Sequence, residues 1–417
     1  MRSHMTAFGV GAGLSLLVAA VFALVAPRIA DAVKDEDGVH VVNIGHGESG
    51  SFKIKEDALN VEADWKGDFA FAADGRTLTS LSGKLEVNAK SKAGQRKAIF
   101  EKRDGSIVAT AFLDGKEIPS GEAEITAASD LLQLFAQSSG VNAESRVKAM
   151  MNEGGKERVI AEIRMLKGAH AVSAYVETLA EMTTLSKADI ASLLDSVRTL
   201  NSDYAKRNAI SALVRTQALD DQTTGELLEI ARTIDGDHEI RLIVEELAES
   251  GFGKRNLDLA ADLIGEIDND HEIRLAISSI LESDNLSMEA AARALDIAAK
   301  TIEGDYELRL AIEAAEEKVR SPNVGEAALR AAEKIVGDHD RRLAVEEIAE
   351  ELDDRSALWP ELIGSAAKVG DDYERRLALE AISSSAPRTD EIRAALRDAA
   401  ETISSEHERR LALESLN

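Results

Sequence analysis

Hydrophobic residues in the C-terminal half of the chain recur with the period of an amphipathic helix. In most units leucine, alanine and a larger aliphatic residue stand one, two and three positions after a recurring arginine, as in Leu310, Ala311 and Ile312. Such a stripe predicts a helix with one buried face, and its alanine column allows a neighbouring helix to approach closely. The segments between these helices are alanine-rich and end in isoleucine or valine, so they predict a second helix in each unit.

A short phrase marks each unit: an acidic residue, then tyrosine or histidine, then an arginine three positions later. The tyrosines and histidines are 34, 33, 35, 33, 34 and 34 residues apart, and His170 lies 34 residues before the first of them. This period predicts a mainly α fold, an α-solenoid of stacked αα-hairpins in which each repeat contacts its neighbours. We predict that the phrase forms structural joints between repeats; its residues are Asp203, Tyr204, Arg207, Asp237, His238, Arg241, Asp270, His271, Arg274, Asp305, Tyr306, Arg309, Asp338, His339, Arg342, Asp372, Tyr373, Arg376, His407 and Arg410.

Each phrase is expected to begin a helix. The acid suits the positive end of the helix dipole, and Gly304 is expected to permit a sharp reversal from the preceding helix. Good N-cap residues stand before the acid in four units, namely Ser202, Asn269, Asp371 and Ser405. Ser405 with Glu408, and Asn269 with Glu272, have the spacing of a capping box.

The remaining residues of the phrase suggest packing and ion pairing. We expect the ring to pack over the end of the preceding repeat and the arginine to pair with a carboxylate of its own or an adjacent repeat. The double arginines at 341–342, 375–376 and 409–410 leave open an anionic partner, and the histidines leave open a response to pH. A zinc site is not predicted, because Leu275 takes the place of the second histidine in the His-Glu-x-x-His motif that begins at His271.

Residues 38–120 have a different pattern, typical of strands. Hydrophobic and polar residues alternate most clearly at 39–42, 59–63 and 84–87. Asp-Gly pairs, which favour hairpin turns, stand at 74–75, 104–105 and 114–115. The strongest predicted pairing joins residues 96–103 to residues 106–114. Together these features predict a small antiparallel β-module of four to six short strands.

Two local patterns in the β-module suggest chemistry but have simpler explanations. Gly47-Glu48-Ser49-Gly50-Ser51 falls short of a nucleophile elbow because a serine replaces the last glycine, and it fits a polar turn. His40 and His46 lack a nearby cysteine or well-placed carboxylate, so surface histidines are the simpler interpretation. We therefore expect no catalytic residue, no cofactor and no metal site, and predict that the protein is not an enzyme.

A helical transition, residues 126–168, is expected between the β-module and the solenoid repeats of residues 169–417. Helices are predicted at 127–137, 143–152 and 156–167, with Gly154-Gly155 breaking the chain between the last two. An irregular first unit is typical of a repeat array, which needs a cap at its end.

The N-terminal segment contains an uncharged apolar stretch, residues 8–26, that ends at Pro27. This stretch can just cross a bilayer, whereas Ala30-Asp31-Ala32 has the pattern of a signal-peptide cleavage site. Residues 1–32 are therefore expected to be either a cleaved signal peptide or an uncleaved membrane anchor. Both alternatives predict a periplasmic or extracytoplasmic location for the rest of the chain.

Charge and cysteine content narrow the classes of partner. The net charge is −27, and residues 201–417 contribute −23 of it through 49 acidic and 26 basic side chains. An acidic array with only 4% aromatic residues is poorly suited to phosphate backbones and bases, so no nucleic-acid partner is expected. The chain has no cysteine, which excludes disulfides and thiol catalysis.

Several tracts resemble a known protein family. They are Gly-Lys-Leu-Glu-Val at 83–87, Phe-Leu-Asp-Gly-Lys-Glu-Ile-Pro at 112–119, and Ser-Asp-Tyr-Ala-Lys-Arg at 202–207, with shorter matches at 143–147 and 153–163. The chain resembles the extracytoplasmic region of uncharacterised bacterial proteins, which is also fused behind some BlaR/MecR-type membrane metallopeptidases. The resemblance covers nearly all of residues 60–417 and implies a β-rich segment leading into helical repeats. The multi-span peptidase and its His-Glu-x-x-His are missing, so the resemblance implies a sensor-like or scaffolding module without proteolysis.

Two functional hypotheses follow. The first is an exported scaffold that binds a protein or peptide in the bacterial envelope as a sensor or adaptor module, tethered to the membrane through residues 8–26 if these are not cleaved. The alternative is a structural protein whose repeats stack into oligomers or filaments. The last predicted helix, residues 406–416, has no partner helix, so an uncapped C-terminal repeat is expected to accept another copy of the chain.

Overall fold

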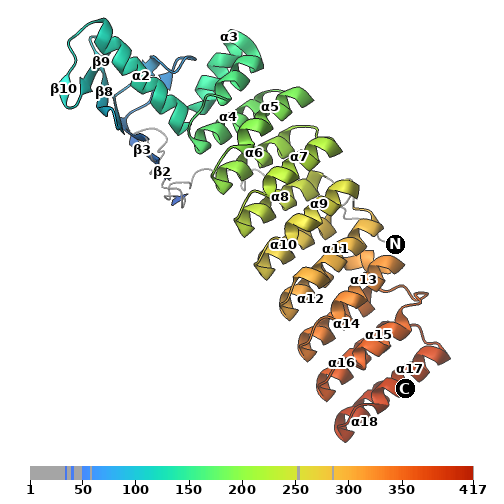
Figure 1. The fold of residues 1–417 in the computed structure, drawn as a ribbon. Helices are drawn as coiled ribbons and strands as arrows, with labels where there is room; N and C mark the ends of the chain where they lie inside the picture. Colours follow the sequence, from blue (N-terminus) through green and yellow to red (C-terminus); the bar gives the residue numbers. More distant parts are fainter. Residues whose placement is uncertain are drawn as a thin grey trace, which may run out of the picture. The chain divides into compact units, whose positions relative to one another are not determined.

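The computed structural model describes residues 33–34, 39–41, 49–56, 59–250, 254–283 and 286–416, and Figure 1 labels its elements. The chain divides into two compact units, residues 1–179 and 180–417, which are described separately. The predicted leader or anchor, residues 1–32, lies outside the described residues, as does His46. Within the described part of the chain, no helix is both long enough and apolar enough to cross a membrane.

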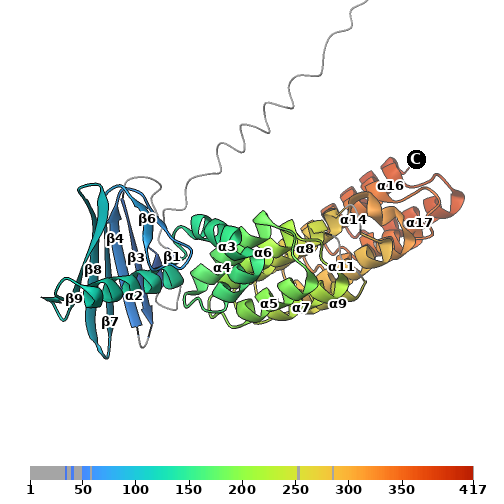
Figure 2. The ribbon, with the colours of Figure 1, turned by 90° about the horizontal axis from the view of Figure 1, so that it is seen from above.

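The N-terminal unit contains an antiparallel sheet of eight strands (Figure 2). In spatial order these are β1 (Val33–Lys34), β2 (Val39–Val41), β3 (Ser49–Glu56), β4 (Leu59–Lys66), β7 (Lys84–Ser91), β8 (Gly94–Arg103), β9 (Ser106–Leu113) and β10 (Lys116–Glu117). A separate hairpin pairs β5 (Phe69–Phe71) with β6 (Leu78–Leu81). The antiparallel β-module is confirmed, but the described residues form more strands than the four to six predicted. Residues 49–51, predicted as part of a polar turn, instead belong to β3, in which the buried Phe52 and Ile54 alternate with exposed lysines.

The strongest predicted hairpin is present with the expected register. Arg96 pairs with Leu113 and Arg103 with Ser106, across a turn at Asp104 and Gly105. Both turn residues have positive φ, 50° and 82°, which is the requirement that favours an Asp-Gly pair in a two-residue hairpin.

One helix covers the inner face of the sheet and closes the core of this unit. α2 (Glu122–Ser139) runs across the strands in Figure 2 and is longer than the predicted helix at 127–137. Phe135 of α2 is fully buried, with ring centroids of Phe52, Phe71 and Trp65 at 5.7, 5.8 and 6.2 Å. Alternate residues of β7 and β8 are likewise buried and point toward this core.

Two further helices complete the N-terminal unit around a buried arginine. α3 (Ala143–Ile163) is interrupted at Gly154 and Gly155, whose φ/ψ values are non-helical, so the predicted break is confirmed. α4 is Ala169–Met182. The fully buried Arg146 donates from Nη1 to the Tyr175 hydroxyl (2.8 Å), from Nη2 to Glu162 (2.5 Å) and from Nε to the carbonyl of Ala73 (3.3 Å). One side chain thus ties the β5–β6 connection to both halves of α3 and to α4.

The C-terminal unit is a stack of αα-hairpins in two layers, which confirms the predicted helical repeats (Figure 1). The first layer consists of α6 (Asp203–Thr216), α8 (Asp237–Ser250), α10 (Asp270–Glu282), α12 (Asp305–Glu313), α14 (Asp338–Glu351), α16 (Asp372–Ser385) and α18 (Glu406–Ser415). The second layer consists of α5 (Lys187–Arg198), α7 (Asp221–Ala231), α9 (Lys254–Ile264), α11 (Met288–Thr301), α13 (Pro322–Ala332), α15 (Trp359–Ala366) and α17 (Asp390–Glu401). Every helix of the first layer begins at the acid of a phrase, as predicted.

In the first-layer helices, the face that carries the predicted hydrophobic stripe is buried. The alanine two positions after the arginine is 0% exposed at Ala276, Ala311 and Ala344, which lets adjacent helices of the layer pack closely. The leucine before this alanine is only half-buried, as at Leu310. One irregularity was not predicted: α12 stops early and a 3₁₀ helix, η1 (Glu316–Arg320), follows, with a positive φ of 42° at Glu316.

Candidate functional site

The repeated phrase is the most regular chemical feature of the molecule, and its residues lie together at the joints between repeats. The side chains of Ser202, Asn269, Asp371 and Ser405 cap the helices that follow them, accepting hydrogen bonds from backbone N–H groups of the first turn. Gly304 and Gly337 take this position before α12 and α14. The acid of the phrase is then the first residue of the helix, where its negative charge interacts favourably with the positive end of the helix dipole.

The acid also makes a contact that the sequence did not predict. Asp305 accepts hydrogen bonds from the backbone N–H groups of Val336 (2.9 Å) and Gly337 (2.6 Å), the two residues before the next helix of its layer. The same pair of contacts is made by Asp203, Asp237, Asp270, Asp338 and Asp372. Hydrogen bonds from Ser405 and Ser404 hold the pKa of Asp372 below its ordinary value. Each carboxylate therefore fastens the next repeat.

Glycine stands directly before the acid in several joints, but the contact does not require it, since the N–H groups of Asn269, Asp371 and Ser405 donate to the corresponding carboxylate. Gly304 has an extended backbone with φ −78° and ψ 122°, so the sharp reversal expected there does not use a conformation that only glycine favours. A Cβ at Gly304 would lie 3.0 Å from a carboxylate oxygen of Asp270, and one at Gly337 would lie 3.0 Å from Asp305. A side chain at either position would press on the contact between repeats.

The arginine of the phrase links its own helix to the next repeat. Arg342 donates from Nε to Glu374 of the following repeat (2.5 Å) and from Nη1 to Glu346 of its own helix (2.5 Å). Burial alone would lower the pKa of this guanidinium, but its bonds to the two glutamates hold the pKa above its ordinary value. Arginines that reach a carboxylate of the next repeat in the same way are Arg241, Arg274, Arg309 and Arg376.

These ion pairs take the glutamates expected to complete capping boxes. Glu272 and Glu408 accept from Arg241 and Arg376 of the preceding repeat. Only the other half of each capping box forms, in which the N-cap side chain accepts from the backbone N–H of the glutamate. A charged pair with a largely buried guanidinium is the stronger contact for the carboxylate.

The ring of the phrase lies at the surface beside the arginine of its own helix. This contact stands in place of the predicted packing over the end of the preceding repeat. Guanidinium carbons lie 4.9, 5.2 and 5.1 Å from the ring centroids of Tyr204, Tyr306 and Tyr373. Nδ1 of the corresponding histidines lies 3.1, 3.2 and 3.5 Å from the arginine Nη2 at His238, His271 and His339. The guanidinium groups of Arg241, Arg309, Arg342 and Arg376 thus have a carboxylate on each of two sides and a ring on a third.

The double arginines also have partners inside the array. Arg341 donates to the carbonyl oxygens of Ile335 and Glu333, which follow the end of α13, and to that of Lys368 in the next repeat (3.3 Å). Arg375 donates in the same way to Val369 and Thr402. These contacts disfavour the alternative that the double arginines bind an anionic partner.

The last phrase differs in its contacts. His407 lies 3.9 Å from Glu408, and its side chain is 65% exposed. Arg410 pairs with Glu414 of its own helix at 3.6 Å, and both side chains are more than half exposed. The face that α18 presents beyond this joint is therefore charged.

The joint between α6 and α8 contains buried polar atoms that lack a hydrogen-bond partner in the described part of the chain. Arg207 Nε, Ser211 Oγ and Glu246 Oε2 are buried without a hydrogen-bond partner among the described residues. Burial raises the pKa of Glu246, although its other oxygen accepts from Arg215 (3.1 Å). The contact between α6 and α8 therefore contains polar groups that the later joints satisfy.

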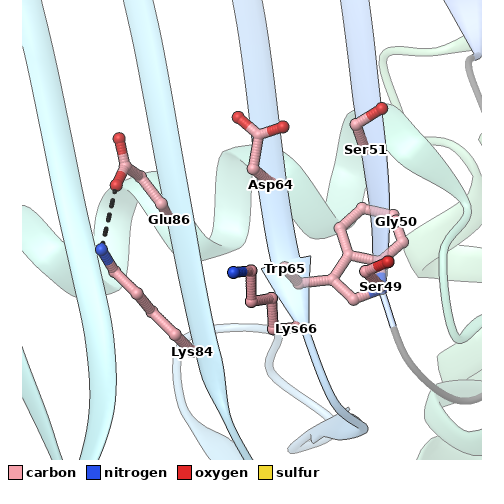
Figure 3. Close-up of a pocket in the computed structure, with 8 residues that line it drawn as sticks. All are labelled: Ser49, Gly50, Ser51, Asp64, Trp65, Lys66, Lys84 and Glu86. Atoms are coloured by element: carbon pink, nitrogen blue, oxygen red, sulfur yellow. Dashed lines mark ion pairs between the residues drawn. The ribbon is translucent and has the colours of Figure 1, made fainter.

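The β-module carries an open concavity of about 530 Å³ on its surface (Figure 3). It is lined by Ser49, Gly50, Ser51, Asp64, Trp65, Lys66, Lys84 and Glu86. Glu86 pairs with Lys84 (3.4 Å) and with Lys97. Burial would raise the pKa of Glu86, but Lys97 outweighs it and holds this pKa below its ordinary value. Ser49 of the elbow-like tract lines the same concavity from β3, which is separated by β4 from the strand that carries this ion pair.

Within the described residues, no group of three or more histidine, aspartate or glutamate side chains is placed to hold a metal ion. The histidines of the phrase lie in separate repeats, each beside an arginine and a glutamate. This arrangement suits ion pairing more than metal ligation, because a neighbouring guanidinium repels a cation.

The comparisons with known proteins assign neither a family nor a function to this chain. No protein family and no curated protein matches the chain. One similar solved structure is described as "Computational Design of Self-Assembling Cyclic Protein Homooligomers", with 17% identity, coverage of 69% of this chain and 92% of that chain, and a TM-score of 0.13. A TM-score this low shows neither a shared fold nor a shared function.

Proposed function

We propose that this protein is a non-enzymatic helical-repeat scaffold that binds a protein or peptide through the surface of its array. The observation that carries the proposal is the use of the repeated phrase: its aspartates and arginines are engaged between repeats. A feature repeated seven times therefore serves to build an extended, regular surface, which is the usual means by which repeat proteins bind partners.

The binding function is tested with the full chain immobilised and challenged with envelope extract. A protein that is retained would be purified and its affinity measured by calorimetry in solution. We expect a saturable complex with a Kd of about 10 µM or tighter, which is the range of specific interfaces. Failure of every purified candidate to bind saturably would contradict the proposal, and so would turnover of a substrate by the protein.

We further propose that the scaffold acts in the envelope of a bacterium, as the apolar residues 8–26 and the resemblance at 60–417 suggest. The full chain expressed with a C-terminal tag should fractionate with the membrane or periplasm. A variant without residues 1–32 should remain in the cytoplasm. Equal distribution of both variants would contradict this location.

The self-assembly alternative uses the same joint chemistry between chains. A joint needs a carboxylate on one repeat and two backbone N–H groups on another, and these groups can belong to different molecules. The net charge of −27 opposes such stacking. Light scattering of the full chain decides between the two: polymers that grow with concentration would favour assembly, whereas a monomer at high concentration would exclude it.

A further inference from the structure

Exposed apolar side chains are unevenly distributed over the helical unit. Among its described residues, the large hydrophobic side chains with more than a third of their surface exposed are Met182, Met288, Tyr306, Val336 and Tyr373. Three of these belong to successive joints: Tyr306 begins α12, Val336 precedes α14 and Tyr373 begins α16. They are 56%, 82% and 52% exposed. Val336 lies beside the start of α12, because its N–H donates to Asp305, the neighbour of Tyr306. Exposed apolar groups that follow one another along a surface are typical of interaction sites.

Val336 is unusual for its position. The corresponding residue in the other joints is polar or glycine, namely Asp235, Asp268, Glu303, Gly370 and Ser404. The joint uses only the backbone N–H of Val336, which donates to Asp305, and leaves its side chain in solvent. Nothing within the joint therefore requires a valine there.

The two tyrosines are held in fixed positions. Tyr306 lies over Arg309, which is bound by Asp340 (3.1 Å) and Glu313 (3.2 Å). Tyr373 lies over Arg376, which is bound by Glu408 (2.6 Å) and Glu380 (2.7 Å). Because the guanidinium groups are anchored on two sides, the rings lose little freedom when a partner contacts them. Ordered tyrosines of this kind often dominate binding energy.

We propose that Tyr306, Val336 and Tyr373 form a docking strip for an extended, basic segment of a partner protein. Helices in one layer are about 10 Å apart, and an extended chain of the polyproline II type rises about 3.1 Å per residue with about three residues per turn. The segment therefore places an apolar side chain on the strip at about every third residue. Its basic character follows from the charge of −23 on residues 201–417, which attracts cations and repels acidic segments. This inference rests on the proposed binding function and assigns that function to the docking strip.

The test uses the full chain as bait for a displayed library of random linear peptides. Peptides enriched on the wild type are synthesised, and their affinities are measured by fluorescence anisotropy. The strip variant carries Tyr306→Ser, Val336→Ser and Tyr373→Ser. The matched control carries Met182→Ser and Met288→Ser, which remove exposed apolar side chains outside the strip. Circular dichroism verifies that both variants keep the helical content of the wild type.

The expected peptides contain lysine or arginine, with apolar residues three positions apart. Their affinity falls about tenfold or more in the strip variant, stays unchanged in the control, and weakens in about 0.5 M salt. Peptides that bind the strip variant as tightly as the wild type would overturn the docking strip while leaving the binding function intact. Enrichment of acidic peptides would overturn the basic segment. If no peptide is enriched, the docking strip fails; the binding function is then judged separately by the calorimetric test with purified envelope proteins.

Discussion

The two units use the same ion-pair chemistry in different ways. In the N-terminal unit a single guanidinium, Arg146, is fully buried and binds groups from a strand connection and two helices. In the helical unit Arg342 is one of several equivalent arginines, each with a small exposed fraction and each bound to carboxylates of its own and the next repeat. The first arrangement concentrates stability in one residue, whereas the second divides it among joints.

Each unit contains its own fluorescent reporter for this comparison. The chain has two tryptophans, Trp65 in the sheet core and Trp359 in α15, and both are buried. Trp359→Phe therefore leaves Trp65 to follow the N-terminal unit, and Trp65→Phe leaves Trp359 to follow the repeats.

The largest effect is expected for Arg146→Met. Removal of the buried guanidinium leaves Glu162 and the Tyr175 hydroxyl without their main partner, so the free energy of unfolding should fall by about 3–5 kcal/mol. The measurement is urea denaturation followed by Trp65 fluorescence. Arg158→Met in the same helix is the control, because Arg158 is 41% exposed and pairs with Glu153. Equal losses in the two variants would contradict the central role of Arg146.

The next effect is expected from overpacking of the alanine column. Ala344 is fully buried between neighbouring helices, so Ala344→Leu should destabilise the repeats by about 1–3 kcal/mol. Ala394→Leu places the same side chain at an exposed position of α17 and should change little. Both are measured by urea denaturation with Trp359 as reporter. A neutral Ala344→Leu would mean that the layer is not closely packed there.

These two sites also show what the sequence can and cannot predict. The alanine column and the helix starts follow from local patterns, since period and capping depend on residues within one or two turns. The contact of Asp305 with Val336 and Gly337 spans 31 and 32 residues, and its only signal was the recurrence of small residues in the joints. No sequence pattern indicated that Arg146 is buried, because an arginine in a helix is normally exposed. The contact between the ring and the arginine of its own helix was not predicted from the sequence.

A smaller effect is expected for Arg342→Met. Its partners Glu346 and Glu374 remain partly accessible to water, so loss of the pairs should cost about 1–2 kcal/mol. Arg393→Met is the control, because Arg393 and its partner Asp390 are exposed. Thermal unfolding of both variants gives the comparison. A loss as large as that of Arg146→Met would show that the joints are not independent of one another.

The smallest effect concerns acid stability, and two carboxylates should respond in opposite directions. The pKa of Asp372 is lowered in the folded protein by backbone N–H groups, so its contribution is present above the unfolded pKa of about 3.9 and is lost as the pH falls further. Asp372→Asn should therefore destabilise near pH 7 and converge with the wild type in acid. Burial raises the pKa of Glu347, so Glu347→Gln should be at least as stable as the wild type near pH 7. Unfolding curves at several pH values check both signs.

We infer that each joint stabilises mainly the repeats it connects, and amide hydrogen exchange of the Asp305→Asn variant tests this inference. The substitution weakens the two bonds from Asp305 to the joint before α14. We expect faster amide exchange in α12, α13 and α14, with an effect that fades toward α6 and α18. A uniform loss of protection from α5 to α18 would contradict it.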